Sequence, residues 1–148
     1  MRISEALVCD TSGLVALADA GDPDHAAVAE AFAVADGPFL LSSLVVAEVD
    51  YLLRRRCGAQ AAHIFAEDVA AGAYSLVQLT TDDLAACTDL DRRYGQLGLR
   101  LAAAHLVVIA QAHKTANLLT LDLKHFRAVK PLWGGKAFRI LPADQHDW

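Results

Sequence analysis

Three acidic residues lie where an α/β fold can gather them at one site. Asp10 follows the apolar run 6–9, Asp122 follows the apolar run 117–121, and Glu48 interrupts an apolar helical stripe. A buried carboxylate is costly unless it is paired or bound to a cation. Mg²⁺ accepts carboxylate oxygens and fills its other positions with water and substrate phosphate oxygens. Because such a cation activates water and offsets charge on a phosphodiester, the three acids indicate metal-assisted phosphodiester hydrolysis.

Each acid also has a purely structural explanation. Asp10 precedes Thr11 and Ser12, and an aspartate in this position commonly caps the following helix. Asp122 lies in a Leu-Asp-Leu-Lys segment, where it can cap a short turn. For Glu48 the structural explanation is weakest, because a carboxylate inside an apolar face needs a partner. The residues alone leave these alternatives open.

Short apolar runs and amphipathic stretches alternate along the chain. The runs 6–10, 39–41, 74–79 and 117–121 predict buried strands, and 138–141 predicts an edge strand. Helices are predicted over 14–19 with Ser12 as N-cap, and over 23–35, 44–56, 59–71, 81–94 and 101–113. This order predicts an α/β fold, with a mostly parallel sheet of four to five short strands flanked by helices, in one domain over 1–148. Functional groups collect beyond the carboxyl ends of such strands, which is where Asp10 and Asp122 lie.

Composition excludes several classes of protein. Hydrophobic residues make up 55% of the chain and mean hydropathy is +0.30. No uncharged apolar run reaches the roughly 18 residues of a membrane span, and the N-terminus is a poor signal peptide, so we expect a cytoplasmic protein that does not enter a membrane. Three cysteines without C-x-x-C spacing indicate neither a disulfide framework nor a zinc site.

Charge is distributed unevenly around a net value of −5. Residues 1–50 hold nine acids and one arginine, whereas residues 123–140 hold five basic residues and no acid. An acidic pocket beside a basic rim would place metal ions and then a polyanion, although a run of charge is usually only a solvated face. The candidate contacts for the phosphates of such a polyanion are Arg54, Arg55, Lys124 and Arg127.

Four segments together resemble the PIN domain, and within it the VapC-type toxins of toxin–antitoxin pairs. They are VCDTSGLVAL at 8–17, VVAEVDYLL at 45–53, LGLRLAAAHLVVIA at 97–110 and LLTLDLKHFRAVKP at 118–131. No single segment is decisive, but their order and spacing are specific. In order and spacing they extend over nearly the whole chain, from residue 8 to residue 131.

The resemblance implies a Mg²⁺- or Mn²⁺-dependent endoribonuclease that hydrolyses RNA and is inhibited by a cognate VapB-type antitoxin. By motif, Asp10, Glu48 and Asp122 match the metal-binding acids, and Thr11 or Ser12 matches a supporting hydroxyl. The family commonly forms homodimers. An apolar face lined by Val45, Val49 and Leu53 is a candidate docking surface for the antitoxin.

The chain departs from the family pattern at Ala103. Family members usually carry Asp in a Leu-Ala-Asp-Ala motif, and this chain has Leu-Ala-Ala-Ala at 101–104. His105 cannot substitute, because residues i and i+2 point about 200° apart on a helix. The chain is therefore expected to be nearly inactive. We favour an introduced Asp→Ala change over natural loss of activity, because the surrounding residues still match a working site.

Two other functions remain as alternatives. A haloacid-dehalogenase-like phosphotransferase also has an Asp after the first strand, but it needs a second acid where Ser12 stands. A catalytically inert PIN-like module would bind RNA or a protein without cleaving anything. Restoring the acid at position 103 separates an enzyme from such a module.

Overall fold

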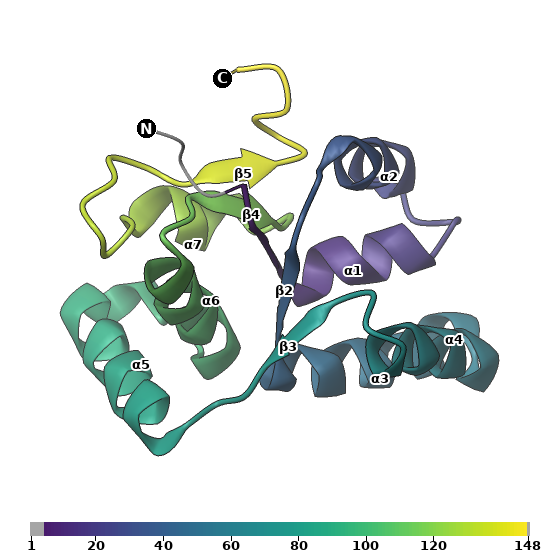
Figure 1. The fold of residues 1–148 in the computed structure, drawn as a ribbon, viewed down its shortest axis with the longest axis horizontal. Helices are drawn as coiled ribbons and strands as arrows, with labels where there is room; N and C mark the ends of the chain where they lie inside the picture. Colours follow the sequence, from purple (N-terminus) through teal and green to yellow (C-terminus); the bar gives the residue numbers. More distant parts are fainter. Residues whose placement is uncertain (1–4, 148) are drawn as a thin grey trace.

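The computed structural model describes residues 5–147 and contains one five-stranded sheet. All strand pairs are parallel, in the order β3-β2-β1-β4-β5 (Figure 1). The sheet confirms the predicted α/β architecture, and the run near 138–141 is its edge strand β5. The strands are β1 (Leu7–Cys9), β2 (Phe39–Ser42), β3 (Ser75–Val77), β4 (Asn117–Leu119) and β5 (Arg139–Leu141).

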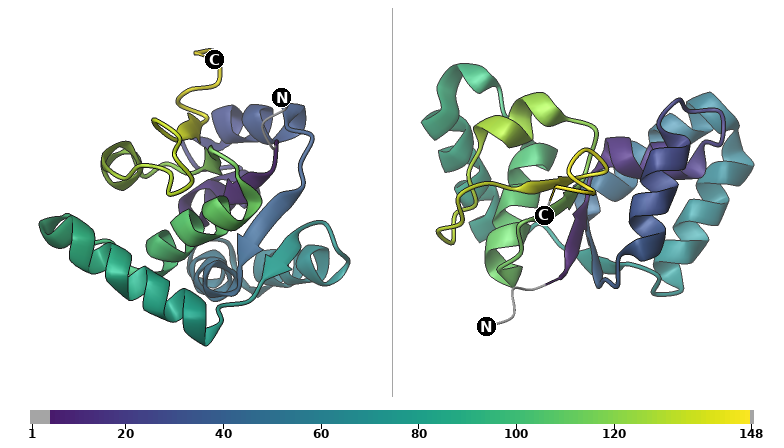
Figure 2. Two further views of the ribbon diagram at one scale, coloured as in Figure 1. Left: turned by 60° about the vertical axis from the view of Figure 1, so that its left-hand side comes forward. Right: turned by 90° about the horizontal axis from the view of Figure 1, so that it is seen from above.

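Helices cover both faces of the sheet. Those from α1 to α4 lie on one side and those from α5 to α7 on the other (Figures 1 and 2). No helix in the part of the chain that the structure describes is long and apolar enough to span a bilayer. The helices are α1 (Thr11–Ala18), α2 (His25–Val34), α3 (Ser43–Cys57), α4 (Ala59–Ala70), α5 (Thr81–Tyr94), the 3₁₀ turn η1 (Gly95–Leu97), α6 (Leu101–His113) and α7 (Leu123–Ala128).

The apolar face of α3 is part of the core. Val45, Val49 and Leu53 are each 0% exposed, in one hydrophobic cluster with the strands. The prediction that these residues form a docking surface for an antitoxin is therefore wrong. Their helical spacing identified a buried face correctly, but this face packs inside the domain itself.

Two local features differ from the sequence prediction. Helix α1 begins at Thr11, and its N-cap is Asp10, whose side chain accepts a hydrogen bond from the Thr11 amide, so Ser12 is not the cap. Helix α7 was not predicted, because six residues are too few to show helical periodicity. Its N-cap is Asp122, whose side chain accepts from the His125 amide. The capping explanations for both acids thus hold, alongside any further role.

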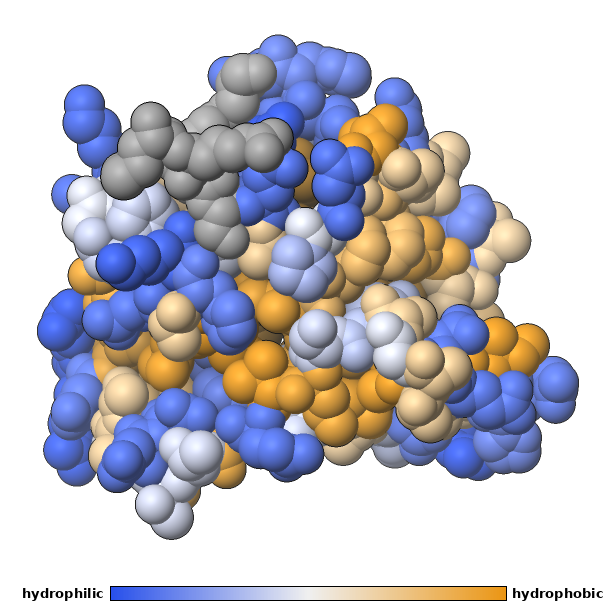
Figure 3. Space-filling model, viewed as in Figure 1, coloured by the Kyte–Doolittle hydropathy of each residue, from blue (hydrophilic) through white to orange (hydrophobic). Residues whose placement is uncertain are grey.

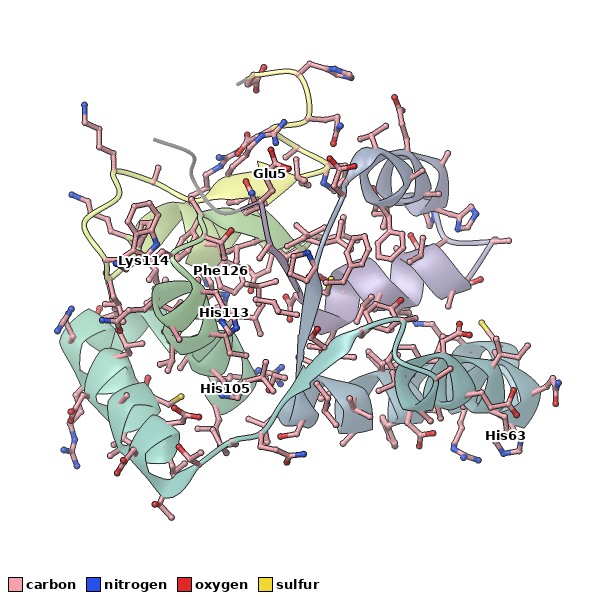
Figure 4. The ribbon with its side chains drawn as sticks, in the orientation of Figure 1. Glu5, His63, His105, His113, Lys114 and Phe126 are labelled. Atoms are coloured by element: carbon pink, nitrogen blue, oxygen red, sulfur yellow. The ribbon has the colours of Figure 1, made fainter. Side chains whose placement is uncertain are left out.

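A buried histidine joins three elements of the fold. His105 on α6, labelled in Figure 4, is 0% exposed. Its Nδ1 is 2.6 Å from Ser42 Oγ, and its Nε2 is 3.4 Å from Asp83 Oδ2. Ser42 also caps α3, and Asp83 belongs to the capping box of α5. His105 therefore ties α6 to the starts of α3 and α5.

Acid should destabilise the fold through His105. Burial lowers the pKa of His105, although the neighbouring Asp83 opposes this shift. The unfolded chain then binds the proton more tightly than the native state, so stability is lost as pH falls through about 6.5. Urea unfolding at pH 7.5 and 5.5 should show this loss as a lower free energy of unfolding at pH 5.5. His105→Asn should make the difference between the two pH values smaller, whereas His63→Asn, at an exposed position, should leave it unchanged. An equal difference for the parent and both variants would contradict the prediction.

Candidate metal centre

The junction between the strand ends of β1 and β4 brings the first and last acids together. We use the term β1–β4 junction for residues 10–13 and 119–122. The Asp10 amide donates to the Leu119 carbonyl at 2.9 Å, which continues the pairing of the two strands past Cys9. Thr120 Oγ1 then donates to Asp10 Oδ2 at 2.7 Å. The start of α1 is thereby fixed to the end of β4.

The hydroxyl groups of Ser12 and Thr120 complete the junction, and their donor and acceptor roles can be assigned. Because Thr120 has one hydroxyl proton and donates it to Asp10, the 3.2 Å contact with Ser12 requires the Ser12 hydroxyl to donate. Ser12 Oγ accepts in turn from the Leu121 amide at 2.9 Å, and Thr120 Oγ1 accepts from the Asp122 amide at 3.0 Å. One threonine therefore orients both acids.

Gly13 permits the close approach of α1 to β4. A Cβ at this position would lie 2.8 Å from the Leu119 carbonyl oxygen and 2.9 Å from the Leu119 Cγ. Real side chains do not reach such distances from backbone, so only glycine fits without moving the helix. The glycine of the Asp-Thr-Ser-Gly segment is thus a requirement of packing.

Glu48 reaches the same region from α3. Thr11 Oγ1 donates to Glu48 Oε1 at 2.7 Å, so Thr11 holds the first two acids, Asp10 through its amide and Glu48 through its hydroxyl. Arg100 Nη2 donates to Glu48 Oε2 at 3.2 Å. Arg100 is the residue that precedes α6, and its side chain is 76% exposed.

Asp122 is held by the turn that it caps. Its Oδ1 accepts from the His125 amide at 3.1 Å, and its Oδ2 lies 2.7 Å from the ring Nδ1 of His125. The ring Nε2 of the same histidine is 3.1 Å from the Leu97 carbonyl oxygen. Each carboxylate oxygen of Asp10, Glu48 and Asp122 therefore has a polar partner and keeps a lone pair for a further ligand.

Asp10 and Asp122 share one open cavity, which we call the acid pocket. It has a volume of about 300 Å³ and is lined by Asp10, Thr11, Ser12, Val15, Asp22, Leu52, Arg56, Arg100, Leu121 and Asp122. Burial raises the pKa of Asp10, and the charges of Asp122 and Glu48 raise it further, against hydrogen bonds from Thr120 and Thr11. Asp122 and Glu48 thus lie close enough to Asp10 to repel its charge.

The donors present suit a hard divalent cation. Asp10 and Asp122 offer oxygen atoms in one pocket, and Mg²⁺ needs only one or two carboxylates besides water. A cation there would also relieve the repulsion that raises the pKa of Asp10. Within residues 5–147, however, no three His, Cys, Asp or Glu side chains already converge as a metal site.

Position 103 lies in the first turn of α6, three positions after a residue of this pocket. Arg100 is the N-cap of α6, and its side chain lines the acid pocket. Ala103 is not among the residues that line the pocket. Ala103 itself is partly buried and packs against the core.

The four candidate phosphate contacts have different surroundings. Arg54 pairs with Asp50 at 3.0 Å, and the Arg55 guanidinium lies 5.6 Å from the centre of the Tyr51 ring. Lys124 is exposed on α7. Arg127 makes a bidentate pair with the buried Asp144 at 2.8 and 2.6 Å. None of the four lines the acid pocket, whereas Arg56 and Arg100 do.

Sequence reasoning missed three residues of the site, which are Thr120, Arg100 and His125. Thr120 had a usable signal, because it lies two residues before Asp122 in the same motif. The signal for His125 was weaker. It lies three positions after the N-cap Asp122, and a residue at that position can contact the N-cap. The pairing of Arg100 with Glu48, 52 positions apart, depends on tertiary structure alone.

Removing the charge of Asp10 should stabilise the protein at neutral pH. Because its pKa is raised in the folded state, the native protein binds this proton more tightly than the unfolded chain, and stability is lost as pH rises above about 3.9. Asp10→Asn should therefore raise the urea midpoint at pH 7 in EDTA, with a gain that shrinks toward pH 4. Asp24→Asn, at an exposed site, is the control. A lower midpoint for Asp10→Asn would mean that the hydrogen bonds to the carboxylate outweigh its burial.

Comparisons with known proteins agree with this geometry. The family model of the PIN domain matches residues 7–131. Ribonuclease VapC26 of Mycobacterium tuberculosis is 35% identical over 136 residues, which cover 92% of this chain and all of that protein. The crystal structure of VapC20 from the same organism, described as a sarcin–ricin loop cleaving toxin, has the same fold with a TM-score of 0.74. That match has 24% identity and covers 79% of this chain and 90% of the other. This chain belongs to the PIN-domain family and, within it, to the VapC ribonucleases.

Proposed function

We propose that this chain is the toxin of a toxin–antitoxin pair, a divalent-metal-dependent endoribonuclease that Ala103 leaves nearly inactive. The observation that carries the proposal is the acid pocket, where Asp10 and Asp122 are oriented by one threonine while Glu48 is held beside them. Asp10, Glu48 and Asp122 would hold Mg²⁺ or Mn²⁺. When bound, the cation supplies an activated water and offsets charge on the RNA phosphodiester.

The protein's own residues orient and screen these acids. Thr120 and Thr11 fix the carboxylates, and Ser12 fixes Thr120, before a ligand arrives, so little reorganisation is needed on binding. Arg56 and Arg100 line the same pocket and suit the phosphates of RNA on either side of the cut. Arg54, Arg55, Lys124 and Arg127 remain candidates for contacts farther along the strand.

Partners follow from the same proposal. A VapB-type antitoxin would inhibit by covering the acid pocket, and an arginine or lysine from it would suit the three acids. We also propose a homodimer in the cytoplasm, as the family resemblance implies.

An inert binding module is the second candidate, and the alanine at position 103 is the observation that favours it. A phosphotransferase of the haloacid-dehalogenase type has less support. The position of its second acid is taken by Ser12, whose hydroxyl group is used within the β1–β4 junction.

Restoring the acid should restore cleavage. A missing ligand should cost at least the roughly 10–100-fold typical of lost supporting contacts, so Ala103→Asp should cut RNA at least that much faster. The assay compares this variant with the parent and with Ala103→Asn, which has the same shape without the charge, in Mg²⁺, Mn²⁺ and EDTA. Cleavage by Ala103→Asp alone, abolished by EDTA, is the expected result.

The opposite results separate the two candidates. RNA binding without cleavage by any of the three proteins would favour the inert module. Equally fast cleavage by the parent would show that position 103 is not required. Metal binding has a separate readout, because Mg²⁺ should raise the thermal midpoint of Ala103→Asp more than that of the parent.

A further inference from the structure

One exposed aromatic residue lies next to the acid pocket. Apolar residues gather on the face of the molecule in Figure 3, and large exposed ones occur on several elements. Tyr51 on α3, with 58% of its surface exposed, differs from the others because it lines a cavity that shares three lining residues with the acid pocket. We call this cavity the tyrosine groove. It has a volume of about 430 Å³ and is lined by Thr11, Ala47, Glu48, Tyr51, Leu52 and Arg100.

We propose that the tyrosine groove is a nucleobase subsite, in which an unpaired RNA base stacks on Tyr51 while Arg100 contacts its phosphate. This inference rests on the proposed function, and it adds the recognition of single-stranded RNA. A volume of about 430 Å³ lies within the range of small-molecule sites, roughly 300–1,000 Å³. Unpaired bases are commonly bound by stacking on aromatic side chains and arginine planes.

Arg100 connects the subsite to the acids. Together with Thr11 and Leu52 it lines both cavities, so one nucleotide strand can pass from the groove into the acid pocket. A single nitrogen of its guanidinium contacts Glu48, at 3.2 Å, and the side chain is 76% exposed. The other donors of the guanidinium therefore remain for a phosphate, which arginine can bind in a bidentate manner.

The ring of Tyr51 is held in position before a ligand binds. Arg55 donates from Nη1 to the Tyr51 hydroxyl at 3.0 Å, and its guanidinium lies over the ring at 5.6 Å from the centre. A cation thus lies at the hydroxyl end of the ring, while the ring still borders the groove. An ordered aromatic face beside two arginines suits a base and its phosphate better than it suits an apolar peptide.

The parent chain allows binding to be measured without cleavage, because it lacks the acid at position 103. The probe is a fluorescein-labelled 12-nucleotide single-stranded RNA of mixed sequence, followed by anisotropy in Mg²⁺. Tyr51→Ala should weaken binding about 5- to 150-fold, the range for loss of one base–aromatic stack. Tyr51→Phe should stay within about twofold of the parent if stacking carries the contact. Leu84→Ala, an exposed apolar residue on α5, is the matched control.

Arg100 and the base itself give two further tests. Arg100→Ala should weaken binding and reduce the salt slope by about 0.7, as expected for one phosphate contact on a single strand. Arg92→Ala, on α5, is the charge-matched control and should change neither. A series of probes, each with one abasic position, should contain one that removes the difference between the parent and Tyr51→Ala, because the base that stacks is then absent.

Each contrary outcome overturns the subsite in a distinguishable way. If the parent binds the probe and Ala103→Asp cleaves it, but Tyr51→Ala binds normally, only the subsite fails. If Tyr51→Ala loses affinity for a VapB-type antitoxin and keeps it for RNA, the groove belongs to a protein partner. If the parent does not bind RNA and Ala103→Asp does not cleave it, the proposed function fails as well. Unchanged circular dichroism and thermal unfolding of Tyr51→Ala would confirm that its fold is intact.

Discussion

The hydrogen bond from Thr120 to Asp10 is the contact on which the site depends. It joins residues 110 positions apart and exists because β1 and β4 are neighbouring parallel strands. The same hydroxyl group accepts from the Asp122 amide, so a single side chain sets the positions of two acids. Gly13 allows this geometry, since any side chain there would press against the Leu119 carbonyl and push α1 away from the sheet. The β1–β4 junction, which joins the carboxyl ends of two neighbouring strands, therefore also assembles the site.

This arrangement has a cost in stability that the proposed metal site would explain. Burial and two neighbouring acids raise the pKa of Asp10, so the charged form is unfavourable at neutral pH without a cation. The surrounding groups reduce this cost without removing it. Thr120 and the Thr11 amide donate to Asp10, and Arg100 faces Glu48 at the entrance. Sites of this kind commonly keep such strain because the ligand relieves it on binding.

The sequence was sufficient where local pattern decides the outcome. Asp10 and Asp122 follow apolar runs that form neighbouring strands, and that order alone placed them at one edge of the sheet. The sequence was insufficient where an apolar face of a helix could either pack in the core or bind a partner. Helical spacing identified Val45 and Val49 as one face of α3, but it could not distinguish the core from a partner's docking surface. The contact between Arg100 and Glu48 was also beyond local pattern, because it depends on how α6 packs beside α3.

Ala103 affects chemistry and folding differently because of where the supports of the acids lie. Each hydrogen bond described for Asp10, Glu48 and Asp122 joins residues other than Ala103, so none depends on a carboxylate at that position. The methyl group packs against the core. Removing a fourth negative charge also lowers the repulsion among the remaining acids when no cation is bound. The alanine form should therefore be at least as stable as the acidic form in EDTA and bind a cation less tightly. On the proposed function, such a protein would retain the surfaces proposed to contact RNA and lose the cleavage step.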